Sequence, residues 1–192
     1  MATQQLLPTK KFASEKEWQT WLAKNHNKSN GVWLMFAKKN ADKPTVTYAE
    51  ALDIALCYGW IDGQKNSYDE QYWMQKFVPR GAKSIWSKKN IEHTERLINE
   101  GKMQPAGLKA IEAAKANGMW EKAYDAQSKM TVPEDFLKAL QKNKKANAFF
   151  KTLNRTNLFS IAFRLQTAKK EETRQKRIAK IIEMLEKGEK FH

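Results

Sequence analysis

The chain has 192 residues, a formal net charge of +14 and a single cysteine, Cys57. Its length suits one domain or two small ones, and it is enough to bury about 70% of the surface that the unfolded chain would expose. One cysteine excludes an internal disulfide, and no stretch reaches the ~18 apolar residues that a membrane span requires. Because the first fifteen residues lack the pattern of a secretory signal, we expect a cytoplasmic protein with no membrane span.

Two capping-box patterns mark helix starts in the first third of the chain. Ser14 to Glu17 precedes apolar residues at helical spacing, which predicts a helix that runs to about Lys24. Thr47 to Glu50 has the same form and opens an apolar helix that ends at Gly59, a residue type suited to the left-handed conformation after a helix. Cys57 lies in this apolar run, so we expect a small buried hydrophobe rather than a catalytic thiol.

Three short segments have the composition of strands, at residues 32–36, 60–63 and 71–78. Beyond Pro79 the strand signals end, and helices are predicted after Ser87, at residues 108–117, after Thr131, and at residues 154–167 and 172–187. The fold class is therefore predicted as α+β, with a small, mainly antiparallel sheet and helices in the N-terminal part and an all-helical C-terminal half.

Turn-forming and polar residues between 126 and 132 make this segment the best boundary candidate. The predicted organisation is an α+β core at residues 1–128 and a basic helical region at residues 129–192. The two regions either form separate domains or pack as one unit.

The segment from Gly59 to Asn90 alternates large aromatic side chains with charged and polar ones, a mixture typical of a surface that holds a ligand. Tryptophans beside cations can stack on bases or on another flat ligand. Trp in a small sheet is more often core, and we expect a core position for each of these, with Trp86 the best candidate for exposure. The predicted ligand-binding residues are Trp60, Asp62, Lys65, Arg80, Lys83, Ser84, Trp86, Ser87 and Asn90.

The loop from Pro79 to Ser84 has two interpretations. Its cations and backbone N–H groups precede the start of the Ser87 helix, and a helix start attracts a phosphate or carboxylate. Alternatively, it is a plain loop whose Arg80 pairs with Asp62 or Glu70.

Positive charge is concentrated toward the C-terminus. From Lys142 to His192 there are 14 Lys and Arg against 5 Asp and Glu, so nine of the fourteen excess charges lie in this stretch. One interpretation is an electrostatic footprint for nucleic acid; the other, which we favour, is a solvated helix face without a nucleic-acid motif. The predicted basic surface flanks an apolar stripe on the last helix and consists of Arg174, Lys176, Arg177 and Lys180.

Signatures of metal and cofactor sites are missing from the sequence. His26, His93, His192 and Cys57 are not in the spacing of metal ligands. The glycine-rich loops that hold nucleotide phosphates are absent, and so is the Gly-x-Ser-x-Gly elbow of hydrolases. We therefore predict no metal and no cofactor, and on a helix surface His93 is more often a solvated or hydrogen-bonded side chain than a catalytic one.

Two sequence patterns resemble one known family. Tyr58 to Gly63, Pro79-Arg80, Ser84-x-Trp86-Ser87 and Asn90 resemble the shared block of the bacterial YdeI/OmdA-like proteins, described as bacteriocin-protection, YdeI or OmpD-associated. The segment from Ala168 to Ile178 is similar to the C-terminal signature of that family. The resemblance extends over nearly the whole chain. It implies a role in bacteriocin or stress tolerance and supplies no catalytic residues.

Three hypotheses of function follow. The leading one is a non-enzymatic cytoplasmic binding protein of this family, whose partner is an anionic ligand, nucleic acid or a protein. The second is a nucleic-acid-binding protein that uses the basic C-terminal helices. The third is an enzyme for a small anionic substrate, with Asp62 as acid or base and Arg80 or Lys83 holding the substrate. One concave site that joins Asp62 and Arg80 with Trp86 would favour this hypothesis, and a large separation of Asp62 and Arg80 would exclude it. The oligomeric state is not predicted.

Overall fold

The structure is a computed structural model that describes residues 6–125, 130–168 and 170–191. The chain divides into two units, Met1–Ala123 and Tyr124–His192, which are described separately below. The border predicted between residues 128 and 129 lies outside the described residues. Within the described parts of the chain, none of the helices has the length and apolar character that crossing a membrane requires.

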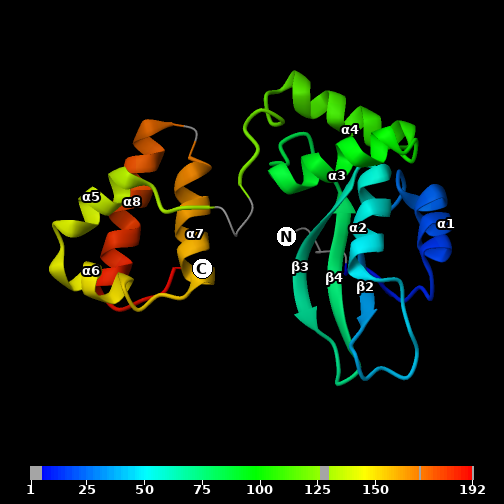
Figure 1. Ribbon diagram of the computed structural model, residues 1–192, viewed down its shortest axis with the longest axis horizontal. Coiled ribbons are helices and arrows are strands. Elements are labelled where there is room, and N and C mark those ends of the chain that lie inside the picture. Colours follow the sequence, from blue (N-terminus) through cyan, green and yellow to red (C-terminus); the bar gives the residue numbers. More distant parts are fainter. Residues whose placement is uncertain (1–5, 126–129, 169, 192) are drawn as a thin grey trace. The chain divides into compact units, whose positions relative to one another are not determined.

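The first unit contains a four-stranded sheet in the order β1-β2-β4-β3 (Figure 1). The strands are β1 (Thr9–Lys10), β2 (Val32–Ala37), β3 (Trp60–Ser67) and β4 (Tyr72–Pro79). β1 pairs with β2 in parallel, whereas the other two pairings are antiparallel. The predicted α+β class with a mainly antiparallel sheet is therefore confirmed. The two-residue β1 was not predicted, since two residues carry no periodicity.

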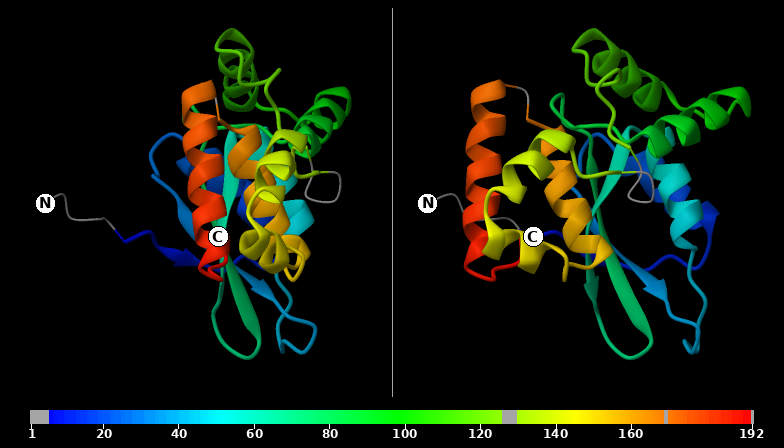
Figure 2. Two further views of the ribbon diagram at one scale, coloured as in Figure 1. Left: turned by 90° about the vertical axis from the view of Figure 1, so that its left-hand side faces the viewer. Right: turned by 60° about the vertical axis from the view of Figure 1, so that its left-hand side comes forward.

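Helices α1 (Glu15–Asn25) and α2 (Tyr48–Cys57) pack on one face of this sheet (Figure 2). Both begin at the predicted caps, because the hydroxyls of Ser14 and Thr47 accept hydrogen bonds from the backbone N–H groups three residues later. Side chains of β2 alternate between buried and half-buried, so every second one enters the core. This core joins α1, α2 and the sheet through Trp18, Leu22, Leu34, Phe36, Ala51, Ala55, Trp60 and Phe77.

Helices α3 (Lys88–Asn99) and α4 (Pro105–Ala116) complete the first unit. The predicted cap of α3 is present, since Ser87 Oγ accepts a hydrogen bond from the Asn90 N–H at 3.1 Å. α4 passes very close to the end of α2, where the Gln104 N–H donates to the Cys57 carbonyl at 3.1 Å. At this crossing Gly59 has φ +72, a left-handed conformation that favours glycine and ends α2 as predicted.

The second unit consists of helices around a core of its own. They are α5 (Glu134–Gln141), α6 (Lys144–Phe150), α7 (Arg155–Gln166) and α8 (Glu171–Glu186). The predicted apolar stripe of α8 is the main contribution of that helix to the core, since Ile178, Ile181 and Leu185 are buried. The short α6 was not predicted. The helix predicted after Thr131 is α5, which begins at Glu134 after Pro133 and has no side-chain cap.

Candidate functional site

Strands β3 and β4 separate the predicted ligand-binding residues into two groups. Trp60 pairs with Pro79 at one end of this antiparallel pair, and Lys65 pairs with Gln75 nearer the other end. Consequently Asp62 and Lys65 lie along the strands toward the start of α2, whereas the residues from Arg80 onward follow the opposite end of β4. The segment from Gly59 to Asn90 therefore does not form one continuous surface.

The tryptophans of this segment are mostly structural. Trp60 is 1% exposed and its Nε1 donates to the His26 carbonyl at 3.0 Å, which confirms the predicted core position. Trp86 is 2% exposed, so it has the core position expected for each tryptophan, although it was the best candidate for exposure. The reason is tertiary, because buried residues of α4 and the segment after it, among them Ile111 and Met119, pack against the Trp86 ring. Trp73 is half-buried and stacks on Phe36 at 4.6 Å.

Asp62 and Lys65 interact with side chains near the start of α2 and the middle of the sheet. The Tyr48 hydroxyl donates to Asp62 Oδ2 at 2.7 Å, and Gln75 Nε2 donates to the same oxygen at 3.3 Å. Lys65 Nζ lies 4.2 Å from the centre of the Trp73 ring, a cation–π contact. Both charged residues therefore have partners within the sheet.

Arg80, Ser84 and Trp86 line a cavity of about 260 Å³ against α4. The guanidinium carbon of Arg80 lies 3.6 Å from the centre of the Trp86 ring, and the guanidinium nitrogens are buried. Ser84 Oγ accepts a hydrogen bond from the Gly81 N–H at 3.1 Å and so shapes the loop. Asp62 is not among the described residues that line this cavity, so the cavity does not join Asp62 with Arg80 and Trp86 as the enzyme hypothesis would favour.

The remaining members of the predicted site have different surroundings. Lys83 is exposed in the loop before α3. Ser87 caps α3 by accepting a hydrogen bond from the backbone N–H of Asn90, which accounts for the serine in structural terms. Their role in binding a ligand stays a prediction.

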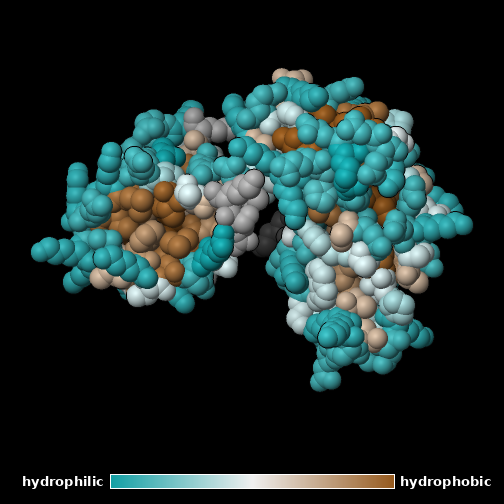
Figure 3. Space-filling model, viewed as in Figure 1, coloured by the Kyte–Doolittle hydropathy of each residue, from teal (hydrophilic) through white to brown (hydrophobic). Residues whose placement is uncertain are grey.

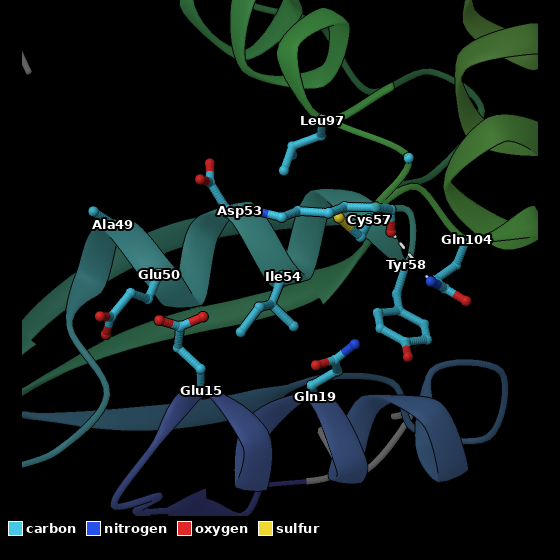
Figure 4. A pocket seen from close by; sticks show the side chains of 12 residues that line it. Glu15, Gln19, Ala49, Glu50, Asp53, Ile54, Cys57, Tyr58, Leu97 and Gln104 are labelled. Atoms are coloured by element: carbon cyan, nitrogen blue, oxygen red, sulfur yellow. Dashed lines mark hydrogen bonds between the residues drawn. The ribbon is translucent and has the colours of Figure 1, made fainter. Parts of the chain in front are cut away.

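A larger cavity, of about 540 Å³, lies on the surface of α2 (Figure 4). α2 contributes residues three or four positions apart, which share one helix face. α1 contributes Glu15 and Gln19, also four residues apart, and the rest come from α3 and the segment between α3 and α4. The lining consists of Glu15, Gln19, Ala49, Glu50, Asp53, Ile54, Cys57, Tyr58, Leu97, Gly101, Lys102 and Gln104.

An ion-pair network fixes the wall of this cavity that faces α3. Asp53 Oδ1 accepts a hydrogen bond from His93 Nδ1 at 2.7 Å, and Asp53 Oδ2 accepts one from Arg96 Nη2. Arg96 also binds Glu100 at 3.0 Å, and Glu100 binds Lys102 Nζ at 2.8 Å. Both oxygens of Asp53 are therefore committed to α3, and Lys102 is held by a neighbouring carboxylate.

The other polar groups of the cavity have distinct protonation states. The backbone N–H and the hydroxyl of Thr47 lower the pKa of Glu50 by hydrogen bonding to it. Burial, reinforced by the charge of Asp53, raises the pKa of the Cys57 thiol to about 11. Burial also raises the pKa of Tyr58. At neutral pH the cavity therefore presents an ionised Glu50 beside a neutral thiol and a neutral phenol.

The polar groups of this lining can hold a bound molecule. A thiol with such a raised pKa is almost fully protonated at neutral pH and is a poor nucleophile. Among the described residues, no group of three or more His, Cys, Asp or Glu side chains is placed to hold a metal ion. What remains are carboxylates, amides and a phenol that can form ion pairs and hydrogen bonds with a bound molecule.

Sequence reasoning missed this cavity. The helical spacing of Glu50, Asp53 and Cys57 was a signal that polar residues share one face of an otherwise apolar helix. The contributions of α1 and of residues 101–104 could not be read from spacing, because only the packing of these segments beside α2 brings them together.

The predicted basic residues of the second unit also divide into two groups. Arg174 forms a bidentate pair with Asp135, at 2.7 and 2.8 Å, and donates to the Leu165 carbonyl at 2.7 Å. Lys176, Arg177 and Lys180 instead line a cavity beside α7. Arg174 therefore joins helices within the unit, whereas the other three cations reach its surface.

Two family models match the chain. Residues 10–110 match the family described as "Domain of unknown function (DUF8412)", and residues 129–188 match the family described as "Bacteriocin-protection, YdeI or OmpD-Associated". The second match confirms the resemblance to that family for the C-terminal region, whereas the block from Tyr58 to Asn90, which was expected to belong to the same family, lies within the first match. No curated protein and no solved structure matches the chain.

Proposed function

The chain belongs to the DUF8412 family, whose description names no activity, and from the cavity on α2 we propose that it is a non-enzymatic binding protein for a small cationic ligand. The main observation behind this proposal is the negative charge of the cavity lining. Three carboxylates, those of Glu15, Glu50 and Asp53, line a 540 Å³ cavity in a protein whose net charge is +14. The only cation among the described lining residues is Lys102, which pairs with Glu100.

The positions of the carboxylates suit an ammonium or guanidinium group. In Figure 4 the side chains of Glu15, from α1, and Glu50, from α2, point toward each other across the groove. A cation placed between these two carboxyl groups can interact with both of them. Gln19 and Tyr58 lie further along the same groove and offer hydrogen bonds to polar parts of the ligand.

The absence of an activated group among the described lining residues supports a binding role. Asp53 is engaged by His93 and Arg96, and the Cys57 thiol is protonated at neutral pH. The proposal extends to a cytoplasmic role in bacteriocin or stress tolerance. Its support is the description of the family matched by residues 129–188 and the unpaired, buried Cys57, which suits a reducing compartment.

Isothermal titration of the full chain with spermidine, and with uncharged 1,4-butanediol as a comparison, tests the ligand class. The variant Glu15→Gln/Glu50→Gln removes two charges, and glutamine at position 50 can still complete the capping box. We expect spermidine to bind and the double variant to bind it about tenfold more weakly, since each carboxylate at the protein surface contributes roughly 0.7 kcal/mol.

The matched control is Glu92→Gln/Glu112→Gln, which removes the same charge from exposed positions on α3 and α4 outside the cavity. Its affinity for spermidine should stay within twofold of the parent protein. Equal losses in the two double variants would show that spermidine responds to overall charge and that the cavity is not its site. Absence of spermidine binding to the parent protein would also refute the proposal.

A further inference from the structure

We propose a second ligand site in the C-terminal unit, which takes an amphipathic anion, a phosphate, sulfate or carboxylate joined to an apolar chain or ring. The site is a cavity of about 340 Å³ beside α7 and α8. Its lining consists of Arg164, Thr173, Lys176, Arg177, Lys180, Ile181 and Phe191. It is independent of the proposed function, because it lies in another unit and has the opposite charge.

Helix periodicity explains why these cations converge. Along α8 the lining positions are Thr173 and the residues three, four, seven and eight positions later, which form one stripe. Arg164 of α7 adds a fourth cation to Lys176, Arg177 and Lys180. None of the described residues that line the cavity is acidic, so the charges there add rather than cancel.

The existing contacts of these cations leave room for an anion. Arg177 Nη1 donates to the Arg164 carbonyl at 2.6 Å, a neutral acceptor that positions the guanidinium without neutralising it. Lys176 pairs with Glu172 at 2.6 Å and Lys180 with Glu183 at 3.9 Å. Both are pairs of exposed side chains within one helix, and such pairs are weak enough for a ligand anion to displace.

The apolar part of the lining selects the class of anion. Ile181 is 1% exposed, and Phe191 is half-buried with the Arg164 guanidinium 5.6 Å from its ring centre. In Figure 3 brown, apolar surface on this unit is bordered by teal, hydrophilic residues. An inorganic anion would use the cations and leave the exposed part of the Phe191 ring in water. A ligand that carries a chain or ring beside its anion uses both.

A concave site also distinguishes this ligand from nucleic acid. Nucleic-acid binding relies on cations spread along a surface so that several phosphates are contacted together. Here three of the predicted cations surround a single cavity, and Arg174 is held by Asp135 instead. The arrangement therefore fits one anionic group better than a polyanion.

Titration of the full chain with monomeric octyl phosphate, below its critical micelle concentration, tests the site. The comparison ligands are inorganic phosphate, which lacks the chain, and octyl glucoside, which lacks the charge. The variant Lys176→Gln/Lys180→Gln removes two exposed cations of the cavity, and Lys144→Gln/Lys145→Gln removes two exposed cations of α6 that lie outside the lining.

We expect one octyl phosphate per chain, bound at least tenfold more weakly by Lys176→Gln/Lys180→Gln and within twofold of the parent by the α6 control. Phe191→Ala should weaken octyl phosphate and leave inorganic phosphate unchanged. Equal losses in both double variants, or inorganic phosphate binding as tightly as octyl phosphate, would overturn the proposal.

The same chemistry occurs in free amphiphiles and in lipid headgroups, and phosphatidylglycerol vesicles separate these sources. Binding of the monomer, with or without binding of vesicles, supports the pocket. Vesicle binding without monomer binding would overturn it in favour of a membrane surface. Binding of single-stranded DNA that is lost in Lys176→Gln/Lys180→Gln, without octyl phosphate binding, would overturn it in favour of nucleic acid.

Discussion

The close crossing of α4 over the end of α2 makes Gly107 a sharp test of the fold around the proposed cationic-ligand cavity. A Cβ atom at this position would lie 2.2 Å from the Cys57 carbonyl oxygen and 2.6 Å from Met103 Cε. Cys57 and Gln104, which lines the cavity beside it, are joined by the backbone hydrogen bond at this crossing. The substitution Gly107→Ala therefore forces α4 away from α2.

The size of the effect follows from two opposing terms. Ordinary contact requires about 3.4 Å, so the backbone must separate by about 1.2 Å. Overpacking of this kind costs typically 1–3 kcal/mol, and a clash with backbone belongs at the upper end. Alanine in a helix recovers roughly 1 kcal/mol relative to glycine. We expect Gly107→Ala to lower the free energy of unfolding of the first unit by about 2 kcal/mol.

Tryptophan fluorescence during urea denaturation measures this unit alone, because all seven tryptophans precede Ala123. Gly81→Ala is the matched control, since Gly81 is outside the left-handed region and the atom nearest to the added Cβ, Ser84 Oγ, lies 4.0 Å away. The control should change the free energy of unfolding by less than about 0.5 kcal/mol. A Gly107→Ala protein as stable as the parent, or more stable, would refute the close crossing of the two helices.

Three further outcomes are expected. With its pKa raised to about 11, the Cys57 thiol should react with Ellman's reagent at pH 8 at least about a hundredfold more slowly in the native protein than in urea; similar rates would contradict its burial. Hydrogen bonding by Arg174 lowers the pKa of Asp135, so the pair stabilises the second unit above about pH 4 and this stability is lost as the pH falls through the lowered value. Arg174→Gln should reduce this loss of stability at acid pH, which melting temperatures followed by circular dichroism at a series of pH values would measure. An unchanged pH profile would disprove the contribution of the Arg174–Asp135 pair. Trp86→Ala should cost the first unit roughly 3–5 kcal/mol in urea denaturation, as for a core aromatic, whereas a cost under about 1 kcal/mol would indicate an exposed ring.

Local signals in the sequence predicted the elements that depend on local chemistry. The caps at Ser14, Thr47 and Ser87 were predicted, and each accepts a backbone hydrogen bond in the structure. Such caps are readable because the side chain and the N–H that it binds are three residues apart. The strand β1 and the helix α6 were missed because neither is long enough to show a periodic pattern.

The candidate sites depend on contacts that no local pattern contains. Trp86 stands among Ser84, Ser87 and other polar neighbours, and this composition suggested exposure. Its burial is caused by residues of α4 and the segment after it, at least twenty positions later in the chain. The cavity on α2 likewise combines side chains from α1, α2 and residues 97–104.

The net charge of +14 does not predict the charge of either cavity lining. The lining of the cavity in the first unit has three carboxylates, whereas four cations line the cavity in the second. Charges beyond about 8 Å are largely screened at physiological ionic strength, so the lining residues decide which ligand is held, and the summed charge acts mainly on its approach.

An amphipathic anion is attracted by both its site and the whole protein, and its affinity should fall as salt is added. A cationic ligand is attracted by its site and repelled by the rest of the protein. Added salt weakens both of these effects, so its affinity should depend less steeply on ionic strength. The difference between the two salt dependences therefore separates binding in a defined cavity from attraction to a highly charged chain.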